Sequence, residues 1–487
     1  MFSRAILRCL SKETIGPKMA ILIRVEVASR ELVPRLLLGL VCAEAGYDVI
    51  VGKLKVDHLK EGRVGRASFR PGLLHLKSPA VTPPLYPTYA ELQGSGYRLS
   101  AQDEEAGISE AVDVDDFFAR RAPREAYEQL DTYLCWGRRD RAGLVRAHPT
   151  MDARAKRTGS PRIDMFRAPA AQRNGVTGSE SRQRFVLWAS SASPLRKTTL
   201  FSYEADRLSQ WDSPDTARFW HEWREGPSSP TAVELLARQS ETFTFFARVV
   251  ESIEALAAAA PKTQIVIRPH HKEDSSAWRL TTSHLPNVTV ETAGEISEWI
   301  ASASLVIHTM STVGLQARLL GVPTINFVGL GGKGRPMSLS GVRVDSPETL
   351  LGAALPILSS EERGVISGEE AHSSLAEHFD ALDGELASER ILRVWENVFD
   401  RDLMSDPIAL KRERSKFALR RRTVGARLRH EGEPFPNLAG KSFPALESSD
   451  WRQLHDYLKA RFGRFSNVQM TPLGPFDALL SSRNPAG

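Results

Sequence analysis

Two short runs of mostly apolar residues, each ending abruptly in a polar turn, constrain this chain more than any other feature. Residues 264–267 run into Arg268, Pro269 and His270, and residues 305–308 run into Ser311 and Thr312. Short β-branched runs that end at polar residues are typical of buried parallel strands, whose carboxyl ends face a ligand crevice. The pair therefore predicts an open α/β sheet with a ligand site along one edge.

The second turn leads into residues 313–320, which have the pattern of a helix. Ser311 and Thr312 then lie at its N-cap, next to unpaired backbone N–H groups and the positive end of the helix dipole. This arrangement suits a phosphate. Taken alone, however, Ser311 and Thr312 are more often simple helix caps. The turn has no Gly-rich P-loop and no GxGxxG motif, which argues against an ATPase or a dehydrogenase.

These motif residues resemble the bacterial surface carbohydrate biosynthesis proteins, a GT-B-like family related to capsule-synthesis proteins and to glycosyltransferases that use CMP-activated sugars. That family has an Arg-Pro-His-Pro-x-Glu turn and a Ser/Thr-Thr-x-Gly-Leu-Glu-Ala turn. The matching residues are Arg268, Pro269, His270 and Glu273 in the first turn, and Ser311, Thr312, Gly314, Leu315 and Ala317 in the second. Residues 25–32 and 159–164 resemble segments of the family's N-terminal half, so the similarity spans roughly residues 20–330.

The resemblance implies a GT-B-like α/β fold, in which two doubly wound Rossmann-like halves face a cleft. It also implies a metal-independent glycosyltransferase of surface polysaccharide synthesis, without a cofactor, whose donor is a CMP-activated ulosonic acid such as Kdo or a sialic-acid relative. The acceptor would be a lipid-linked or other glycan. Donor-binding residues would be Arg268, His270, Glu273, Ser311, Thr312, Gly314 and Gln316.

Acid–base chemistry would come from the first half of the chain. Glu26 follows the first predicted strand, and Glu104 and Glu105 lie in a turn that resembles the family's acidic pair. Without the resemblance, solvated loop acids are the ordinary interpretation of Glu104 and Glu105. Arg30 and Arg268 are candidates for binding a carboxylate or phosphate through their planar guanidinium groups.

Three positions depart from the family pattern: His271 replaces Pro, Gln316 replaces Glu, and Ala106 is inserted after the acidic pair. Gln offers one acceptor and one amide donor, where Glu offers two acceptors to a ribose diol. Two further functions therefore stay open. One is a UDP-sugar 2-epimerase or a glycerophosphate-type polymer transferase on the same fold. The other is a catalytically silent subunit of a polysaccharide assembly complex.

The order of predicted elements suggests four regions. They are an extension over 1–18, a first Rossmann-like half over 19–178 on the acceptor side, a second half over 184–400 that binds the nucleotide sugar, and a basic helical tail over 401–487. Strands are expected at 20–25, 47–52, 72–76, 132–136, 184–188, 264–267, 305–308 and 323–328. The polar stretch 169–184 is expected to link the halves.

Composition is that of a globular protein, with 41% hydrophobic and 25% charged residues among 487. No apolar run approaches the ~20 residues of a membrane-spanning helix. The three cysteines have no metal-ligand spacing, and no site for a metal is expected, so a cytoplasmic location is predicted.

The charge is concentrated in residues 411–430. This stretch has nine Lys or Arg residues and one glutamate, a charge of +8, whereas the whole chain carries +5, so the rest sums to −3. Phe417 is its only aromatic residue, which disfavours nucleic acid. The sequence favours an anionic membrane surface as the partner, which would hold the protein peripherally on the inner membrane, and a solvated basic helix without a partner is the alternative.

Overall fold

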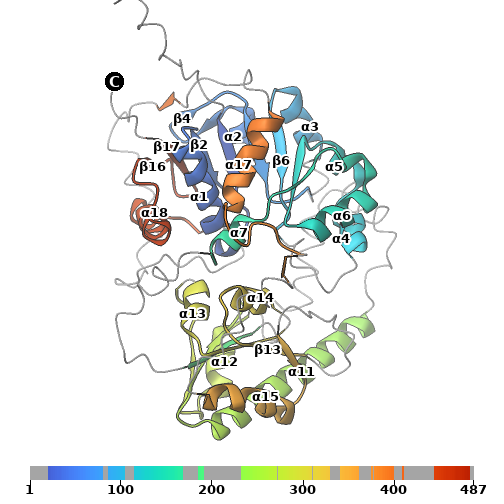
Figure 1. The fold of residues 1–487 in the computed structure, drawn as a ribbon, viewed down its shortest axis with the longest axis vertical. Coiled ribbons are helices and arrows are strands. Elements are labelled where there is room, and N and C mark those ends of the chain that lie inside the picture. The colour runs from blue at the N-terminus through green and yellow to red at the C-terminus, as the bar shows by residue number, and fades with distance from the viewer. Residues whose placement is uncertain are drawn as a thin grey trace, which may run out of the picture.

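The computed structural model describes residues 20–79, 86–104, 114–167, 185–190, 232–270, 273–294, 296–309, 311–328, 341–360, 375–376, 378–399, 409–410 and 444–482. These residues form two α/β halves, which lie one above the other in Figure 1. The predicted extension (1–18), the linker (169–184) and the basic segment 411–430 lie outside the described residues. No helix in the described part of the chain is both long and apolar enough to cross a membrane.

The first half is built on an eight-stranded sheet in the order β16-β17-β2-β1-β5-β6-β7-β8. The six strands from β2 to β8 in this order run parallel, and their order reverses between β1 and β5. This reversal creates a topological switch point at the carboxyl ends of β1 and β5. The strands are β1 (Ile21–Arg24), β2 (Val49–Gly52), β5 (Leu73–Leu76), β6 (Arg98–Ala101), β7 (Thr132–Cys135), β8 (Ala155–Arg157), β16 (Val468–Pro472) and β17 (Asp477–Ser482).

Alternate residues of β1 enter the two cores of this half. Ile21 and Ile23 pack beside helix α1 (Ala28–Glu44), whereas Leu22 points into the opposite core. The helices of the opposite face are α3 (Tyr86–Gly94), α4 (Val114–Arg121), α5 (Arg124–Glu128) and α6 (Arg138–Ala147). Shorter elements are α2 (Val56–Lys60), α7 (Pro161–Asp164), the 3-10 turn η3 (Pro149–Met151), and a small sheet of β3 (Arg63–Val64), β4 (Ala67–Ser68) and β15 (Ala409–Leu410).

The second half is a six-stranded, fully parallel sheet in the order β11-β10-β9-β12-β13-β14. Numbered by their sequence within this half, the strands follow 3-2-1-4-5-6, the Rossmann order, with its switch point between β9 and β12. The strands are β9 (Phe185–Ala189), β10 (Gln264–Arg268), β11 (Val288–Val290), β12 (Leu305–His308), β13 (Thr324–Phe327) and β14 (Val342–Val344).

Helices cover both faces of the second sheet. Helices α11 (Ala232–Ala259) and α15 (Pro347–Ser359) pack on one face, and α13 (Ile296–Ser302) and α14 (Thr312–Leu319) pack on the other. Helix α12 (Ser275–Thr282) follows β10 and contributes the buried Trp278. The expectation of a GT-B-like α/β protein with two doubly wound, Rossmann-like halves is therefore confirmed.

The end of the chain differs from the predicted basic helical tail. Helix α17 (Ala387–Val398) and helix α18 (Ser448–Phe462) pack into the core of the first half, where Trp395 and Trp451 are buried. Strand β17 pairs antiparallel with β2, and β16 pairs with β17. The described part of 401–487 therefore belongs largely to the first half, because its apolar residues complete that core. The predicted boundary at residue 400 is corrected accordingly.

Candidate functional site

The switch point of the second sheet lies where β9 and β12 end, at Ser190 and His308. The Ser190 hydroxyl donates a hydrogen bond to Oε1 of Glu273 over 3.3 Å. The other carboxylate oxygen of Glu273 accepts bonds from the backbone N–H of His270 (3.2 Å) and from the indole of Trp278 (3.0 Å). Glu273 is buried. This predicted donor-binding residue therefore fixes the turn that presents His270, and it ties that turn to the end of β9.

Arg268 holds a neighbouring loop in place. Its guanidinium donates to the carbonyl of Ala293 and, over 3.1 Å, to the carbonyl of Gly294, and it lies 5.3 Å from the ring centroid of Trp299. The side chain predicted to bind a donor phosphate is thus engaged with the loop that follows β11. His270 comes two residues later and is half-buried.

Helix α14 begins as the sequence predicts. Ser311 is its N-cap, and the Ser311 hydroxyl accepts the backbone N–H of Val313 over 3.3 Å. The backbone N–H of Ser311 donates to Nδ1 of His308 over 3.1 Å, which fixes the imidazole beneath the helix. A Cβ atom at Gly314 would lie 2.0 Å from Nε2 of His308, so only glycine leaves room for this ring. Thr312 is the first helical residue.

Gln316 lies one turn further along α14 and is nearly buried. Its side-chain oxygen has no hydrogen-bond partner among the described residues. An unsatisfied buried amide oxygen is costly, since it loses its hydration without a replacement bond.

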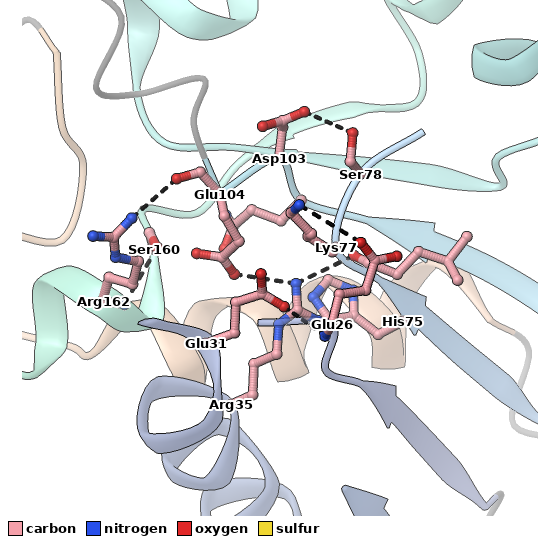
Figure 2. Close-up of polar contacts among 12 residues, drawn as sticks. Glu26, Glu31, Arg35, His75, Lys77, Ser78, Asp103, Glu104, Ser160 and Arg162 are labelled. Atoms are coloured by element: carbon pink, nitrogen blue, oxygen red, sulfur yellow. Dashed lines mark hydrogen bonds and ion pairs between the residues drawn. The ribbon is translucent and has the colours of Figure 1, made fainter. Parts of the chain in front are cut away.

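The switch point of the first sheet carries a charged cluster, which Figure 2 shows in close-up. Glu26 follows β1, and its side chain is 41% exposed. One carboxylate oxygen lies 3.8 Å from Nη2 of Arg24, and the other lies 3.6 Å from Nζ of Lys77. Its backbone N–H donates to the buried carboxylate of Glu31 over 2.8 Å. Glu26 is thus an accessible carboxylate at a strand end, flanked by two cations.

Glu104 has a different environment. Its side chain is 3% exposed, and Oε1 accepts a bond from Nη2 of Arg35 over 3.1 Å. Oε2 of Glu104 and two nitrogens of Arg35, Nε and Nη1, have no hydrogen-bond partner in the described part of the chain. Burial raises the pKa of Glu104 above its usual range, against the opposing charge of Arg35. Glu105 lies outside the described residues.

His75 lies in the same cluster, on β5. Its Nδ1 atom is 3.2 Å from the Ser100 hydroxyl, which also accepts the indole N–H of Trp395 over 3.0 Å. Burial, and then the charge of Arg35, lower the pKa of His75 well below its ordinary value, so the ring is neutral. The neutral ring packs edge-on against Trp395.

The segment 159–164 connects this cluster to the end of the chain. The Arg162 guanidinium donates to the backbone carbonyl of Glu104 over 3.0 Å. Asp164 accepts the backbone N–H groups of Ala387 (2.8 Å) and Ser388 (2.9 Å), and thereby caps the start of α17. Gly159 has a φ of +81° and lies against the carbonyl of Asp380. The described bonds give this family-like segment a structural role.

The two halves meet through α14. Leu315 packs in one apolar cluster with Trp136 and Ile163 of the first half. Ile163 is the neighbour of Arg162, whose guanidinium holds the Glu104 turn. The helix that begins at Ser311 therefore touches the first half beside the residues that position Glu104.

The sequence prediction did not include the partners of the two glutamates. These partners are Arg24, Glu31, Arg35 and Lys77. Glu31 and Arg35 are four residues apart in a helix whose other residues are mostly apolar, and buried charges at such a spacing signal an internal ionic site. Among the described residues, no group of three His, Cys, Asp or Glu side chains is placed to hold a metal ion.

Comparison with known proteins finds no matching family model and no matching curated protein. Solved structures are similar at low identity. HepE from Anabaena in complex with UDP and glucose is 11% identical, with 78% of this chain and 99% of that chain covered and a TM-score of 0.40. The UDP-GlcNAc 2-epimerase of Neisseria meningitidis bound to UDP-GlcNAc is 10% identical, with 78% and 99% covered and a TM-score of 0.45. The wall teichoic acid polymerase TagF is 13% identical, with 80% and 90% covered and a TM-score of 0.42.

Proposed function

We propose that this protein is a glycosyltransferase of surface polysaccharide synthesis that uses a nucleotide-activated sugar. The observation that carries the proposal is the switch point of the Rossmann-ordered second sheet, where β12 leads directly into the Ser311-capped start of α14. Ligands of open α/β sheets bind at such a point, and the amide groups of a helix start stabilise a phosphate. Helix α14 also packs against Trp136 and Ile163 of the first half, and that half carries a second set of charged residues.

The chemistry divides between the halves. Backbone N–H groups at Ser311 and Thr312, together with His270, would bind the donor phosphate and stabilise the charge that develops on it as the sugar leaves. Glu26 would accept the proton of the acceptor hydroxyl, because it is the accessible carboxylate at the opposite switch point. A CMP-linked ulosonic acid is the donor that the family resemblance favours, with a lipid-linked or other glycan as acceptor.

A calorimetric panel of nucleotides tests this proposal. CMP binding is expected, and Ser311→Ala should weaken it, because the cap that orders the first turn of α14 is lost. Ser346→Ala is the matched control, since Ser346 caps α15 in the same half through the same kind of bond. The control should lose similar helix stability, typically ~1 kcal/mol, without a change in nucleotide affinity.

The other outcomes identify the alternatives. Binding of UDP but not CMP, with release of free UDP-sugar epimer, would indicate a UDP-sugar 2-epimerase. Turnover of a CDP-glycerol donor would indicate a glycerophosphate-type transferase. Binding of no nucleotide by the folded protein would refute the glycosyltransferase proposal and favour a silent assembly subunit.

A further inference from the structure

The charged cluster at the end of β1 and β5 contains cations whose bonding is incomplete. Lys77 follows β5 and its side chain is only 13% exposed, yet among the described residues its ammonium contacts only Glu26, at 3.6 Å. That separation is longer than a hydrogen bond. An ammonium has three donors, and the described residues accept no hydrogen bond from this one, so it is available to an acceptor that reaches it from solvent.

Arg24 borders the same space. Its Nη1 atom donates to the Tyr89 hydroxyl over 2.7 Å, and Nη2 lies 3.8 Å from Glu26. Its Nε atom is buried and has no partner in the described part of the chain. Each cation therefore lies near one oxygen of the same carboxylate, at 3.8 Å and 3.6 Å, and neither forms a hydrogen bond with it. An oxygen-bearing group in contact with both cations would supply the acceptors that Glu26 does not.

The balance of charge around this space is positive. The buried carboxylates of Glu31 and Glu104 are engaged by Arg30 and Arg35. Glu26 alone is then set against Arg24 and Lys77. Helix α1 begins here as well. Its N-cap, Val27, supplies no side-chain acceptor, and Glu31 is the acidic residue in its first turn.

We propose that Arg24 and Lys77 bind an acidic group, a carboxylate or a phosphate, of the acceptor substrate beside Glu26. Two cations in fixed positions bind an oxyanion through charge-assisted hydrogen bonds. The adjacent carboxylate repels the acid group itself, so a hydroxyl of the same molecule lies next to Glu26. The site thus selects acidic acceptors and directs one of their hydroxyl groups to the base. That the acidic group belongs to an acceptor substrate rests on the proposed function. That an acidic group binds here does not depend on the proposed function.

The test uses four probes on the full chain: methyl glucuronide and glycerol 3-phosphate, each with its neutral counterpart, methyl glucoside and glycerol. Binding is measured by ligand-observed NMR. At least one acidic probe is expected to bind, and its neutral counterpart is expected to bind at least about tenfold more weakly. Lys77→Gln and Arg24→Gln should each weaken the acidic probe about tenfold. Lys60→Gln is the matched control, because Lys60 is an exposed lysine paired with Glu91 on the same half.

Glu26→Gln adds a sharper readout. It removes the negative charge that competes for both cations while keeping the shape, so the acidic probe should bind more tightly, by a few-fold. A simple folding defect would weaken binding instead. Preference for the glucuronide or for the glycerol phosphate identifies the carboxylate or the phosphate as the natural group.

Other outcomes overturn the inference. Equal binding of acidic and neutral probes would show that no anion is selected. Loss of glycerol phosphate binding in Ser311→Ala, with no change in Lys77→Gln, would place the phosphate on α14 instead. The nucleotide panel is measured separately on the same protein. If an acidic probe binds through Lys77 but no nucleotide binds, the transferase proposal is refuted and the acid site is retained. If a nucleotide binds but no acidic probe binds through Lys77, only the acid site is refuted.

Discussion

Burial separates the two described glutamates that were predicted to be catalytic. Glu26 is open to solvent at the end of β1, whereas Glu104 is enclosed with Arg35. Glu26→Gln is expected to lower the rate of donor turnover by about 10² or more and to leave nucleotide affinity unchanged, because only the proton acceptor is lost. Glu104→Gln is expected to act on stability, since it leaves the Arg35 charge buried without its counterion. Turnover assays and urea unfolding of both variants check this assignment, which full activity of Glu26→Gln would contradict.

A second prediction concerns Asp140, whose carboxylate accepts the backbone N–H of Trp136 on one oxygen and has no described partner on the other. Burial raises the pKa of Asp140 from 3.8 to about 7. Between these values the folded protein keeps a proton that the unfolded chain has lost. The contribution of Asp140 to the free energy of unfolding is therefore fully present below pH 4. It is lost as the pH rises through 7, by on the order of 4 kcal/mol.

Asn cannot ionise, so Asp140→Asn should gain stability relative to the wild type as the pH rises from 4.5 to 8. Denaturant unfolding at the two pH values measures this difference. Asp152→Asn, at an exposed aspartate of the same half, is the control. Its difference in stability from the wild type should be the same at both pH values. A constant difference between Asp140→Asn and the wild type would mean that Asp140 is ionised throughout.

A third prediction concerns the close contact between Gly314 and His308. Gly314→Ala places a methyl group on Nε2 of a ring that the backbone N–H of Ser311 holds in place, so α14 must shift. The expected cost is about 1–3 kcal/mol of unfolding free energy, together with weaker nucleotide binding. The double variant with His308→Ala removes the clash, and should therefore lose less stability than the two single changes added together. Strict additivity in a double-mutant cycle would show that the two side chains do not interact.

At the scale of elements, the sequence predicted the inner strands well. The expected strand at 305–308 and the observed β12 have identical bounds, and the expected strand at 264–267 differs from β10 by one residue. These strands are buried on both faces, so their apolar residues are continuous and their ends are sharp. The N-cap at Ser311 was predictable for the same reason, because it follows such an end.

The hairpin of β16 and β17 was not predicted, and the reason is physical. The concentrated charge of residues 411–430 is the strongest sequence signal in this part of the chain. The hairpin is short and mixed in polarity, so its own signal is weak. Its pairing partner, β2, lies more than 400 residues earlier, and local patterns carry no information about such contacts. The turn signal, with Gly474 and Pro475 between the strands, was present in the sequence.

The buried ionic partners were missed for a related reason. Arg35 and Lys77 become a site only when α1 and β5 are adjacent, and the parallel pairing of β1 with β5 brings this about. A family motif identifies only the residues that match it, so partners such as Arg35 and Lys77, which lie outside the motifs, are not identified. The residues that did match, Arg268 and Glu273, are engaged in holding turns.

Helix α18 supplies a prediction at this scale. Trp451 is fully buried in the core that α18 shares with α1, whereas its neighbour Arg452 is exposed. Trp451→Ala should lower the free energy of unfolding by about 3–5 kcal/mol, as for other large core residues. Arg452→Ala should change it by less than about 0.5 kcal/mol. If both variants unfolded at the same urea concentration as the wild type, α18 would not be part of the stable first half.

At the scale of the whole molecule, we propose that residues 411–430 hold the protein at an anionic membrane surface near a lipid-linked acceptor. Each basic residue near such a surface contributes about 1 kcal/mol, and salt screens the attraction within ~8 Å. Binding to anionic vesicles should therefore weaken as salt rises. Replacing Arg420, Arg421 and Arg422 by Gln should weaken it further without changing nucleotide affinity. Vesicle sedimentation tests this proposal. If equal amounts of protein sedimented with neutral and with anionic vesicles, this role for the segment would be excluded.

The pairing of β17 with β2 also sets the order in which the molecule is completed during translation. Leu480 lies opposite Val49, so this edge of the first sheet stays open until residues 477–480 have left the ribosome, more than 400 residues after β2. The second sheet needs only strands between Phe185 and Val344. The half that is made later can thus reach its native structure first. The earlier half waits with an uncovered strand edge, which is the kind of surface that chaperones protect.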